Sequence, residues 1–340
     1  MPEAEATIVI TTWNRAQLLR RALESVLRQT VENIEIFVAD NGSTDETPAV
    51  VATFEDPRIV YSRVENNLGL HGGLNRALGL GTAPIIAILH DDDLYYPRNV
   101  EAKLAIFKTY ETVGATYSAF DVLNGRGGIV ARNVTYGGRP RSTLIPGPVF
   151  RRRAMSQLGL SDFSAMMFRR SAVANECFDE RDGLSCDLGL HLRVSTGWDF
   201  GFVDESLTGR AQHEESVSAR SGIESPDLDE RYGVTISHVA GVDATKRRFL
   251  DRYGFTLEDA KHLRRLAGQA KRRELATAAQ RMSWHDRRLK AVLPIVAEAG
   301  KHDPTVLLSR PVAQALLSTA VGERGRSVWH RVQGAPRQAV

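Results

Sequence analysis

Apolar runs alternate with helically spaced apolar residues over the first third of the chain. Runs at 7–12 (TIVITT), 35–39 (EIFVA), 59–64 and 84–89 (PIIAIL) predict four strands. The fourth run is apolar on both faces, as expected of a central parallel strand. Helical spacing predicts helices at 19–26, 72–80 and from Pro97 onward. This alternation predicts an α/β fold, a doubly wound and mostly parallel sheet with helices on both faces.

Two pairs of polar residues have the spacing of reciprocal helix caps. Asn14 stands three residues before Gln17, and Ser43 stands three residues before Glu46. In such a pair the first side chain accepts from the backbone of the first turn and the second reaches back. We therefore expect helices to begin at both places.

Polar segments follow three of the predicted strands directly, at 12–15, 40–45 and 90–93. Ligands of doubly wound sheets bind beyond the carboxyl ends of the strands, so these segments are predicted to be neighbours. Gly42 permits a tight turn in the second segment. Asp40 has no such structural explanation, and we expect its carboxylate to face a base or ribose.

Three adjacent carboxylates, Asp91, Asp92 and Asp93, end the fourth predicted strand. Like charges this close repel one another, and a cation would hold them together. Mg²⁺ or Mn²⁺ fits, because such hard ions prefer oxygen ligands and are often shared with a substrate phosphate. The alternative is an acidic helix N-terminus before Pro97, where carboxylates are also favoured.

The later part of the chain is less regular. Strand-like pieces at 115–122 and 128–134 and a buried segment at 164–170 precede a predicted buried helix at 184–196. From about residue 240 the sequence becomes basic and rich in Ala and Leu. We therefore predict a first domain at 1–239, which divides at about residue 110 into a regular and a less regular half. A basic helical region is predicted at 240–340.

The formal net charge of +3 is unevenly distributed, because residues 241–300 carry 14 Lys and Arg against 7 Asp and Glu. Such a region can contact an anionic membrane surface, or its helices can pack on the first domain or on a second subunit in a homo-oligomer. The solvated or packed helix is the favoured interpretation. The basic groups concerned are Lys246-Arg247-Arg248, Arg264-Arg265 and Lys271-Arg272-Arg273.

Four ordered segments resemble the successive signatures of the family 2 glycosyltransferases, which are inverting enzymes with the GT-A fold. They are Thr11-Thr12-Trp13-Asn14-Arg15, Asp40-Asn41-Gly42-Ser43-Thr44-Asp45, Asn67-Leu68-Gly69 and His90-Asp91-Asp92-Asp93. Two later segments, from Asp187 to Arg193 and from Arg210 to His213, are similar to the family's base and metal-binding segments. The resemblance extends from about Thr7 to Ser218. It implies that 1–239 is the catalytic domain, with a nucleotide-sugar half at about 1–110 and an acceptor half at about 111–239.

The resemblance implies a role for each matching residue. Asp187 would be the general base that deprotonates the acceptor hydroxyl. The metal ion, Mn²⁺ or Mg²⁺, would be held by Asp92, with Asp91 next and Asp93 as the fallback, and His213 would complete the site. The residues that would bind the nucleotide sugar are Thr11, Thr12, Arg15, Asp40, Asn67 and Asp91.

Three positions depart from the family pattern. His90 stands where an Asp is common, which leaves open which carboxylate binds the metal. Leu74 stands where an Arg is common, so a diphosphate contact is missing or supplied elsewhere. Cys186 replaces an acidic residue beside Asp187.

The implied reaction is transfer of a sugar from a UDP- or dTDP-type donor to a carbohydrate or lipid-linked acceptor, in polysaccharide, glycolipid or cell-envelope glycan synthesis. Rival interpretations are a nucleotidyltransferase of related fold and an inactive member that binds carbohydrate or a partner. Nucleic-acid binding is not expected, since the basic region lacks interleaved aromatic residues.

Composition predicts an ordinary globular protein, with 42% hydrophobic and 25% charged residues. No stretch approaches the roughly 20 apolar residues that a membrane span needs, and the start does not resemble a secretory signal. Two cysteines, Cys177 and Cys186, are too few for a disulfide framework. We therefore expect a cytoplasmic protein with reduced thiols, with peripheral attachment at the inner membrane face as the alternative.

Overall fold

The computed structural model describes residues 3–135, 138–157, 163–212, 228–285 and 296–297. Within this part the sheet contains ten strands, and eight of them form the order β3-β2-β1-β4-β9-β6-β10-β5, while β7 pairs with β6 and β8 with β10. The strands are β1 (Ala6–Thr12), β2 (Ile34–Asp40), β3 (Ile59–Arg63), β4 (Ile85–His90), β5 (Leu94–Tyr95), β6 (Val113–Asn124), β7 (Ile129–Val134), β8 (Leu144–Ile145), β9 (Met166–Arg169) and β10 (Asp199–Gln212).

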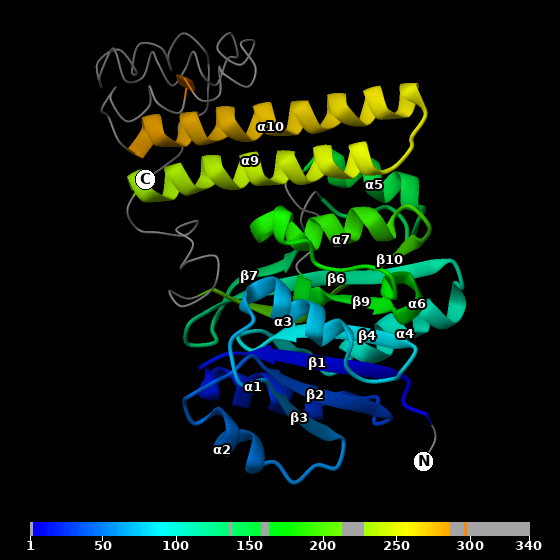
Figure 1. Cartoon of the computed structure of the whole chain (residues 1–340), viewed down its shortest axis with the longest axis vertical. Coiled ribbons are helices and arrows are strands. Elements are labelled where there is room, and N and C mark those ends of the chain that lie inside the picture. The colour runs from blue at the N-terminus through cyan, green and yellow to red at the C-terminus, as the bar shows by residue number, and fades with distance from the viewer. Residues whose placement is uncertain (1–2, 136–137, 158–162, 213–227, 286–295, 298–340) are drawn as a thin grey trace.

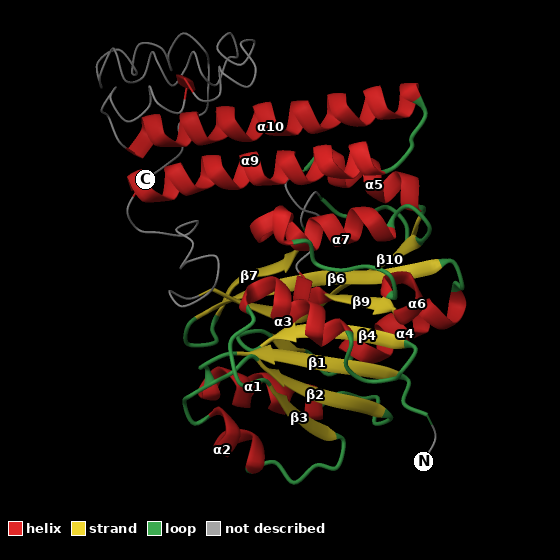
Figure 2. Cartoon of the chain, in the orientation of Figure 1, coloured by secondary structure: helices red, strands yellow, loops and turns green. Residues whose placement is uncertain are grey.

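The sheet is parallel from β3 to β4, and β6 and β10 are also parallel to each other. The short strand β9 lies between these two parallel groups and runs antiparallel to β4 and β6 (Figure 2). The predicted mostly parallel α/β sheet is therefore confirmed, with one antiparallel strand in its middle.

Helices cover both faces of the sheet (Figure 1). The helices are α1 (Ala16–Leu27), α2 (Thr47–Ala52), α3 (Gly69–Leu78), α4 (Asn99–Thr109), α5 (Gly147–Met155), α6 (Arg170–Val173), α7 (Cys186–Val194), α9 (Leu228–Arg252) and α10 (Leu257–His285), with 3₁₀ turns η1 (Phe163–Ala165) and η2 (Glu180–Ser185).

Alternation along β1 divides the core into two layers. Successive side chains of a strand point to opposite faces. Ile8 and Ile10 accordingly pack with Leu23 of α1, whereas Val9 packs with Leu74 of α3. This two-sided burial explains why the parallel strands appear as continuous apolar runs in the sequence.

The C-terminal helices α9 and α10 lie side by side beyond α7 (Figure 1). Phe249 and Leu263 from these helices belong to the same buried cluster as Leu188 of α7 and Phe150 of α5. Residue 240, where the sequence places a domain boundary, lies inside α9. The described part of the basic region is therefore joined to the sheet domain through a shared core.

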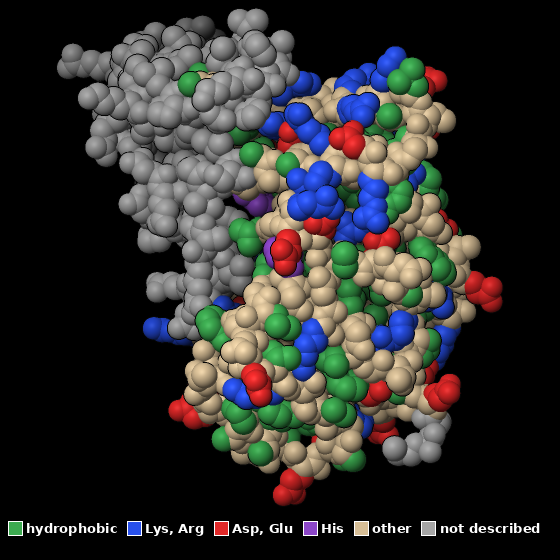
Figure 3. Space-filling view, viewed as in Figure 1, with side chains coloured by type: hydrophobic (Ala, Val, Ile, Leu, Met, Phe, Trp, Pro, Cys, Tyr) green, Lys and Arg blue, Asp and Glu red, His purple; other side chains and the backbone are tan. Residues whose placement is uncertain are grey.

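Lys and Arg side chains gather over α9 and α10 on the face that Figure 3 shows. Several of the basic residues named from the sequence nevertheless have internal partners. Lys246 is buried and donates to the carbonyl oxygen of Met155, and Lys271 donates to Asp243. Among the described helices, none combines the length and the apolar character that crossing a membrane requires.

The two predicted capping boxes are wrong. Neither α1 nor α2 has a side-chain cap of the expected kind. Asp45 serves both helices instead, because its two carboxylate oxygens accept from the backbone N–H groups of Ala16 and Thr47. Asn14 and Ser43 are used to join the two loops, since Asn14 accepts from the Thr44 N–H and Ser43 accepts from the Asn14 N–H.

Candidate active site at the carboxyl ends of the strands

Strand register brings the predicted polar segments to one edge of the sheet. β1 lies between β2 and β4, so Thr12 pairs with Asp40 and Thr11 pairs with His90. The backbone N–H of Asp91 donates to the carbonyl oxygen of Thr11, which keeps the acidic run beside β1. The three segments that follow the strands are therefore neighbours, as the sequence predicted.

Two carboxylates of the acidic run face a single guanidinium group. Nη1 of Arg15 lies 3.2 Å from Asp91 Oδ1 and 3.2 Å from Asp92 Oδ2. The Thr12 hydroxyl donates to the other oxygen of Asp91 at 2.8 Å. The structure thus brings together four residues that the sequence assigned to the nucleotide and metal site.

Asp91 is the electrostatically strained member of this group. Burial and the neighbouring charge of Asp92 raise the pKa of Asp91 to about 6, although Arg15 and Thr12 oppose the shift. The carboxylate is thus removed from water and placed beside a second negative charge, and both effects disfavour its ionised form.

Asp93 and His90, the other two residues of the fourth motif, have hydrogen-bond partners within the protein. Asp93 is buried, and its Oδ1 accepts from the backbone N–H of Ala211, close to the end of β10. His90 Nδ1 lies 3.2 Å from the Thr11 hydroxyl. His213 lies outside the described residues. Among those that are described, no three His, Cys, Asp or Glu side chains form a metal-binding group.

Asp40 is fully buried and has partners within the protein. Its Oδ1 accepts from the Ser43 N–H at 2.8 Å, and its Oδ2 accepts from the Tyr61 hydroxyl at 2.5 Å. Burial and the charge of Asp40 raise the pKa of Tyr61. The expectation that Asp40 has no structural explanation is therefore wrong, whereas its contact with the nucleotide base stays a prediction.

Asn67 shapes the turn that leads into α3. Its Oδ1 accepts from the Gly69 N–H and from the Asn41 side chain, and Asn41 accepts in turn from the Leu68 N–H. Gly42 packs against this turn, where a Cβ atom would lie 3.0 Å from the backbone of Asn66 and Asn67. These contacts fix the relative positions of the second and third sequence motifs.

Leu74 occupies the position where the family often has arginine. It is 5% exposed and packs into the core beneath α3, so it cannot contact a diphosphate. Arg76, two residues later, donates to the Ser62 hydroxyl and the Asp40 carbonyl oxygen. Trp13, within the first motif, is 42% exposed, which leaves its ring accessible for stacking on a base or sugar.

Asp187 lies in the first turn of α7 and is half-buried, with its Oδ1 accepting from the Leu188 N–H. The adjacent Cys186 thiol is buried, and burial together with the Asp187 charge raises its pKa to about 12. The Cys186 thiol therefore stays protonated at neutral pH, and the role of Asp187 as the base stays a prediction. Both cysteines are free thiols, as predicted.

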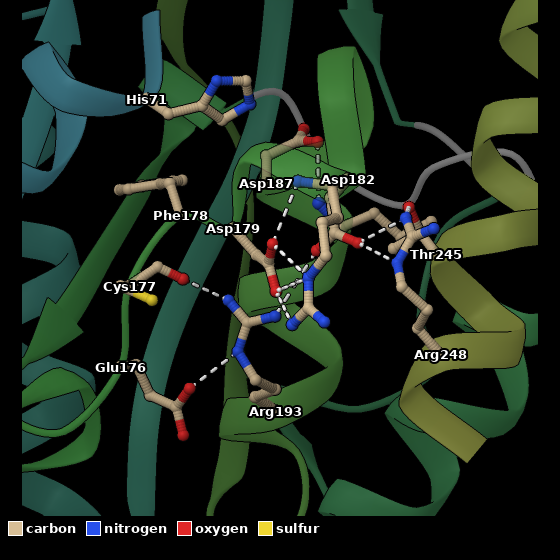
Figure 4. Close-up of polar contacts among 12 residues, drawn as sticks. His71, Glu176, Cys177, Phe178, Asp179, Asp182, Asp187, Arg193, Thr245 and Arg248 are labelled. Atoms are coloured by element: carbon tan, nitrogen blue, oxygen red, sulfur yellow. Dashed lines mark hydrogen bonds and ion pairs between the residues drawn. The ribbon is translucent and has the colours of Figure 1, made fainter. Parts of the chain in front are cut away.

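The sequence interpretation missed two side chains near Asp187. Asp182 is buried and accepts from Arg248 of α9 (Figure 4). His71 lies in α3, and its Nε2 lies 3.0 Å from the Gly183 carbonyl oxygen. The only signal available beforehand was the polar character of residues 179–182, which does not reveal a partner 66 residues away.

Residues 7–175 match the family described as Glycosyl transferase family 2. The chain belongs to this family. The matched range contains all four motifs of the sheet edge, and Asp187 follows it. Family membership is also supported by similarity to individual relatives.

Three relatives illustrate the similarity. An uncharacterized glycosyltransferase of Nostoc is 29% identical over 38% of this chain and 41% of its own length. The succinoglycan biosynthesis protein ExoO of Rhizobium meliloti is 37% identical over 27% of each chain. A PGL/p-HBAD biosynthesis glycosyltransferase of Mycobacterium bovis is 27% identical over 61% of this chain and 73% of its own length. The chain thus spans less than half of the first two relatives.

Solved structures show the same fold at low sequence identity. TarS residues 1–349 of S. aureus, in complex with UDP-GlcNAc, has a TM-score of 0.58 at 14% identity, covering 98% of this chain and 93% of that chain. The mannosyltransferase PcManGT of Pyrobaculum calidifontis, in complex with GDP-Man and Mn²⁺, has a TM-score of 0.55 at 18% identity, covering 97% and 88%. These likenesses confirm the GT-A-type architecture.

Proposed function

We propose that this protein is an inverting, metal-dependent glycosyltransferase that moves a sugar from a UDP- or dTDP-type donor to an acceptor hydroxyl. The observation that supports it best is the cluster of Thr12, Arg15, Asp91 and Asp92 at the sheet edge. Relatives named for succinoglycan and PGL/p-HBAD biosynthesis support a role in polysaccharide, glycolipid or cell-envelope glycan synthesis.

The acidic pair fits a divalent cation. Asp91 and Asp92 lie side by side at the sheet edge and present hard oxygen atoms, the ligands that Mg²⁺ and Mn²⁺ prefer. Asp92, with Asp93 as the fallback and His213 beyond the described residues, would hold the ion together with donor phosphate oxygens. When bound, Mn²⁺ or Mg²⁺ stabilises the negative charge that grows on the departing nucleoside diphosphate.

The residues of the chain itself then have distinct roles. In this proposal Thr11, Thr12, Arg15 and Asn67 orient the nucleotide sugar, and Asp40 supports the loops around it. Asp187 takes the proton of the acceptor hydroxyl as the new glycosidic bond forms from the opposite face of the sugar. A positioned general base of this kind contributes roughly 10²–10⁴-fold to the rate.

A ligand screen tests this proposal. A panel of UDP-, dTDP- and GDP-sugars is added with Mn²⁺, and the shift of the thermal unfolding midpoint is measured. A donor present at 100 times its Kd stabilises the native protein by about 2.7 kcal/mol. We expect UDP- or dTDP-sugars to stabilise the protein, and the shift to fall when a chelator removes the metal.

Turnover is measured with the donors that bind, by release of the nucleoside diphosphate in the presence of hydroxyl acceptors. Full turnover in excess chelator after exhaustive dialysis would refute the metal assignment. Formation of a nucleotide sugar from a sugar 1-phosphate and a nucleoside triphosphate would instead identify a nucleotidyltransferase.

A further inference from the structure

Asp187 follows a kinked turn whose geometry is set by its neighbours. The 3₁₀ turn η2 leads directly into α7, and Asp187 is the second residue of that helix. Gly183 interrupts the turn with φ 52° and ψ −134°, a backbone conformation that glycine tolerates best. A kink of this kind can pivot, so the direction in which α7 presents Asp187 depends on contacts that hold the turn.

The strongest of these contacts comes from the C-terminal helix α9. Arg248 donates to Asp182 Oδ1 through both Nη2, at 2.7 Å, and Nε, at 3.1 Å. Asp182 is 5% exposed and lies next to Gly183 in the chain. Figure 4 shows Arg248 reaching from α9 to this carboxylate. Charge-assisted contacts made by two nitrogens of one guanidinium group restrict orientation as well as distance.

The second oxygen of Asp182 is held by α7 itself. Asp182 Oδ2 lies 3.5 Å from Nη1 of Arg193, whose Nε donates to Glu176 at 2.7 Å. Gly189 makes this approach possible, because a Cβ atom there would lie only 2.1 Å from Asp182 Oδ2. Asp182 therefore links α9 on one side with the helix that carries Asp187 on the other.

Helix α3 holds the opposite side of the same segment. His71 Nε2 lies 3.0 Å from the Gly183 carbonyl oxygen. Asn75 donates to the Phe178 carbonyl oxygen at 3.0 Å and accepts from the Phe178 N–H at 2.6 Å. Because α3 begins at the Asn67–Gly69 turn of the donor site, the turn before Asp187 is fixed between that site and α9.

We propose that Arg248 is a positioning residue for the transfer reaction, which through Asp182 fixes the orientation of the kinked turn and so places Asp187 at the acceptor hydroxyl. The inference rests on the proposed function, in which Asp187 is the base. It assigns the C-terminal helix α9 a part in the reaction that the sequence motifs do not contain.

The physical argument concerns a buried charge. Loss of the Arg248 guanidinium leaves Asp182 buried with only the longer contact to Arg193, and an undercompensated buried carboxylate is costly. The turn can relieve this cost by rotating about Gly183 and carrying Asp182 toward solvent. A displacement of about 1 Å at a reacting group can lower a rate by about 10²-fold.

The test compares Arg248→Gln with Arg247→Gln in the full chain. Arg247 is the matched control, because it neighbours Arg248 on α9, is 66% exposed and pairs with Asp243 of its own helix. Rates of nucleoside diphosphate release are measured with the UDP-, dTDP- or GDP-sugar and acceptor that the wild-type protein uses best. We expect Arg248→Gln to lower kcat about 10- to 10²-fold with the donor KM within about twofold, and Arg247→Gln to change neither.

The conservative variant separates positioning from folding. Arg248→Lys keeps the charge and loses the paired contact, so it should recover part of the lost kcat while leaving the thermal midpoint close to wild type. In the double variant Asp182→Asn/Arg248→Gln, kcat should fall no further than in Asp182→Asn, because the two residues act through one contact. Additive losses, or a kcat for Arg248→Gln equal to that of Arg247→Gln, would overturn the proposal.

Hydrogen exchange provides a measurement that needs no substrate. Backbone amides at 183–190 should exchange faster in Arg248→Gln and Arg248→Lys than in Arg247→Gln, with no change in β1 or β4. Unchanged exchange there overturns the positioning role even if no donor is found. Asp187→Asn with full turnover would instead refute the base assignment of the proposed function, whatever the result for Arg248.

Discussion

Lys246→Met should change how the stability of this protein depends on pH. Lys246 lies on α9 and is 1% exposed, with its amine donating to the carbonyl oxygens of Met155 at 3.0 Å and Gln157 at 2.5 Å. Burial lowers the pKa of this lysine from its ordinary value of 10.5 to about 8, although the nearby Asp243 carboxylate opposes the shift. The amine therefore reports whether α9 stays docked on the end of α5.

The sign of the effect follows from proton binding. Between pH 8 and 10.5 the unfolded chain keeps the proton of Lys246 and the folded chain has lost it, so the free energy of unfolding rises with pH. Below pH 8 the charged amine costs stability in full. The shift corresponds to about 3 kcal/mol, since one pKa unit is worth about 1.4 kcal/mol, and most of this is regained by about pH 10.

Denaturant unfolding followed by circular dichroism, at several pH values from about 7 to 10, measures this contribution. The difference between wild type and Lys246→Met is the informative quantity, because other groups titrate in the same range. Cys186, whose pKa is raised to about 12, lowers stability as pH rises above its unfolded value. Lys261→Met, which removes an exposed lysine of α10, is the control. Parallel pH profiles for wild type and Lys246→Met would refute the reasoning.

Three further predictions address the site and the basic region. Asp187→Asn should keep nucleotide-sugar binding near normal and lower turnover at least ~10²-fold, as measured by steady-state kinetics; unchanged turnover would exclude Asp187 as the base. Gly42→Ala should destabilise the protein by about 1–2 kcal/mol and weaken nucleotide binding, because Gly42 has φ +86° and lies against Asn66 and Asn67. The control Gly241→Ala, on α9 with open space around it, should be neutral or stabilising by up to about 1 kcal/mol. In vesicle co-sedimentation, we expect no salt-sensitive preference for anionic over neutral lipid, because Lys246 and Lys271 have internal partners. Each basic residue that is free to meet an anionic surface would add about 1 kcal/mol of binding free energy. Preferential pelleting with anionic vesicles at low salt would therefore support membrane attachment.

The nucleotide half shows how much of the fold can be predicted from local sequence patterns. Parallel strands buried on both faces are predominantly apolar or β-branched along their length, so β1 and β4 stand out in the sequence. The polar residues that follow such strands converge at one edge by topology alone, which is why Thr12 and Asp91 could be predicted as neighbours. The caps were less predictable, because Asp45 accepts from the first backbone N–H groups of both helices, while Asn14 and Ser43 accept from the backbone of the facing loops.

The fold of the acceptor half depends on contacts between residues far apart in the chain, and such contacts leave little signal in the local sequence. β9 joins β4 to β6 although about 80 residues separate it from β4. The ion pair of the buried Asp182 with the partly exposed Arg248 connects residues 66 positions apart, and each residue alone resembles an ordinary surface charge in the sequence. In the sequence, Leu74 indicated only that an arginine contact of the family motif is missing. The structure shows that Leu74 is a core residue, buried beneath α3.

The sequence by itself determined the order of strands and helices in the nucleotide half and the residue types at the strand ends. These depend on periodicity and on the chemistry of a few adjacent residues, which are local properties of a chain. Only the tertiary structure decided which charges are buried against one another, such as Asp182 with Arg248, and that Asp40 lies fully enclosed. Burial and partnership arise when distant segments pack together, because that is when a carboxylate loses water and must accept its hydrogen bonds from the protein.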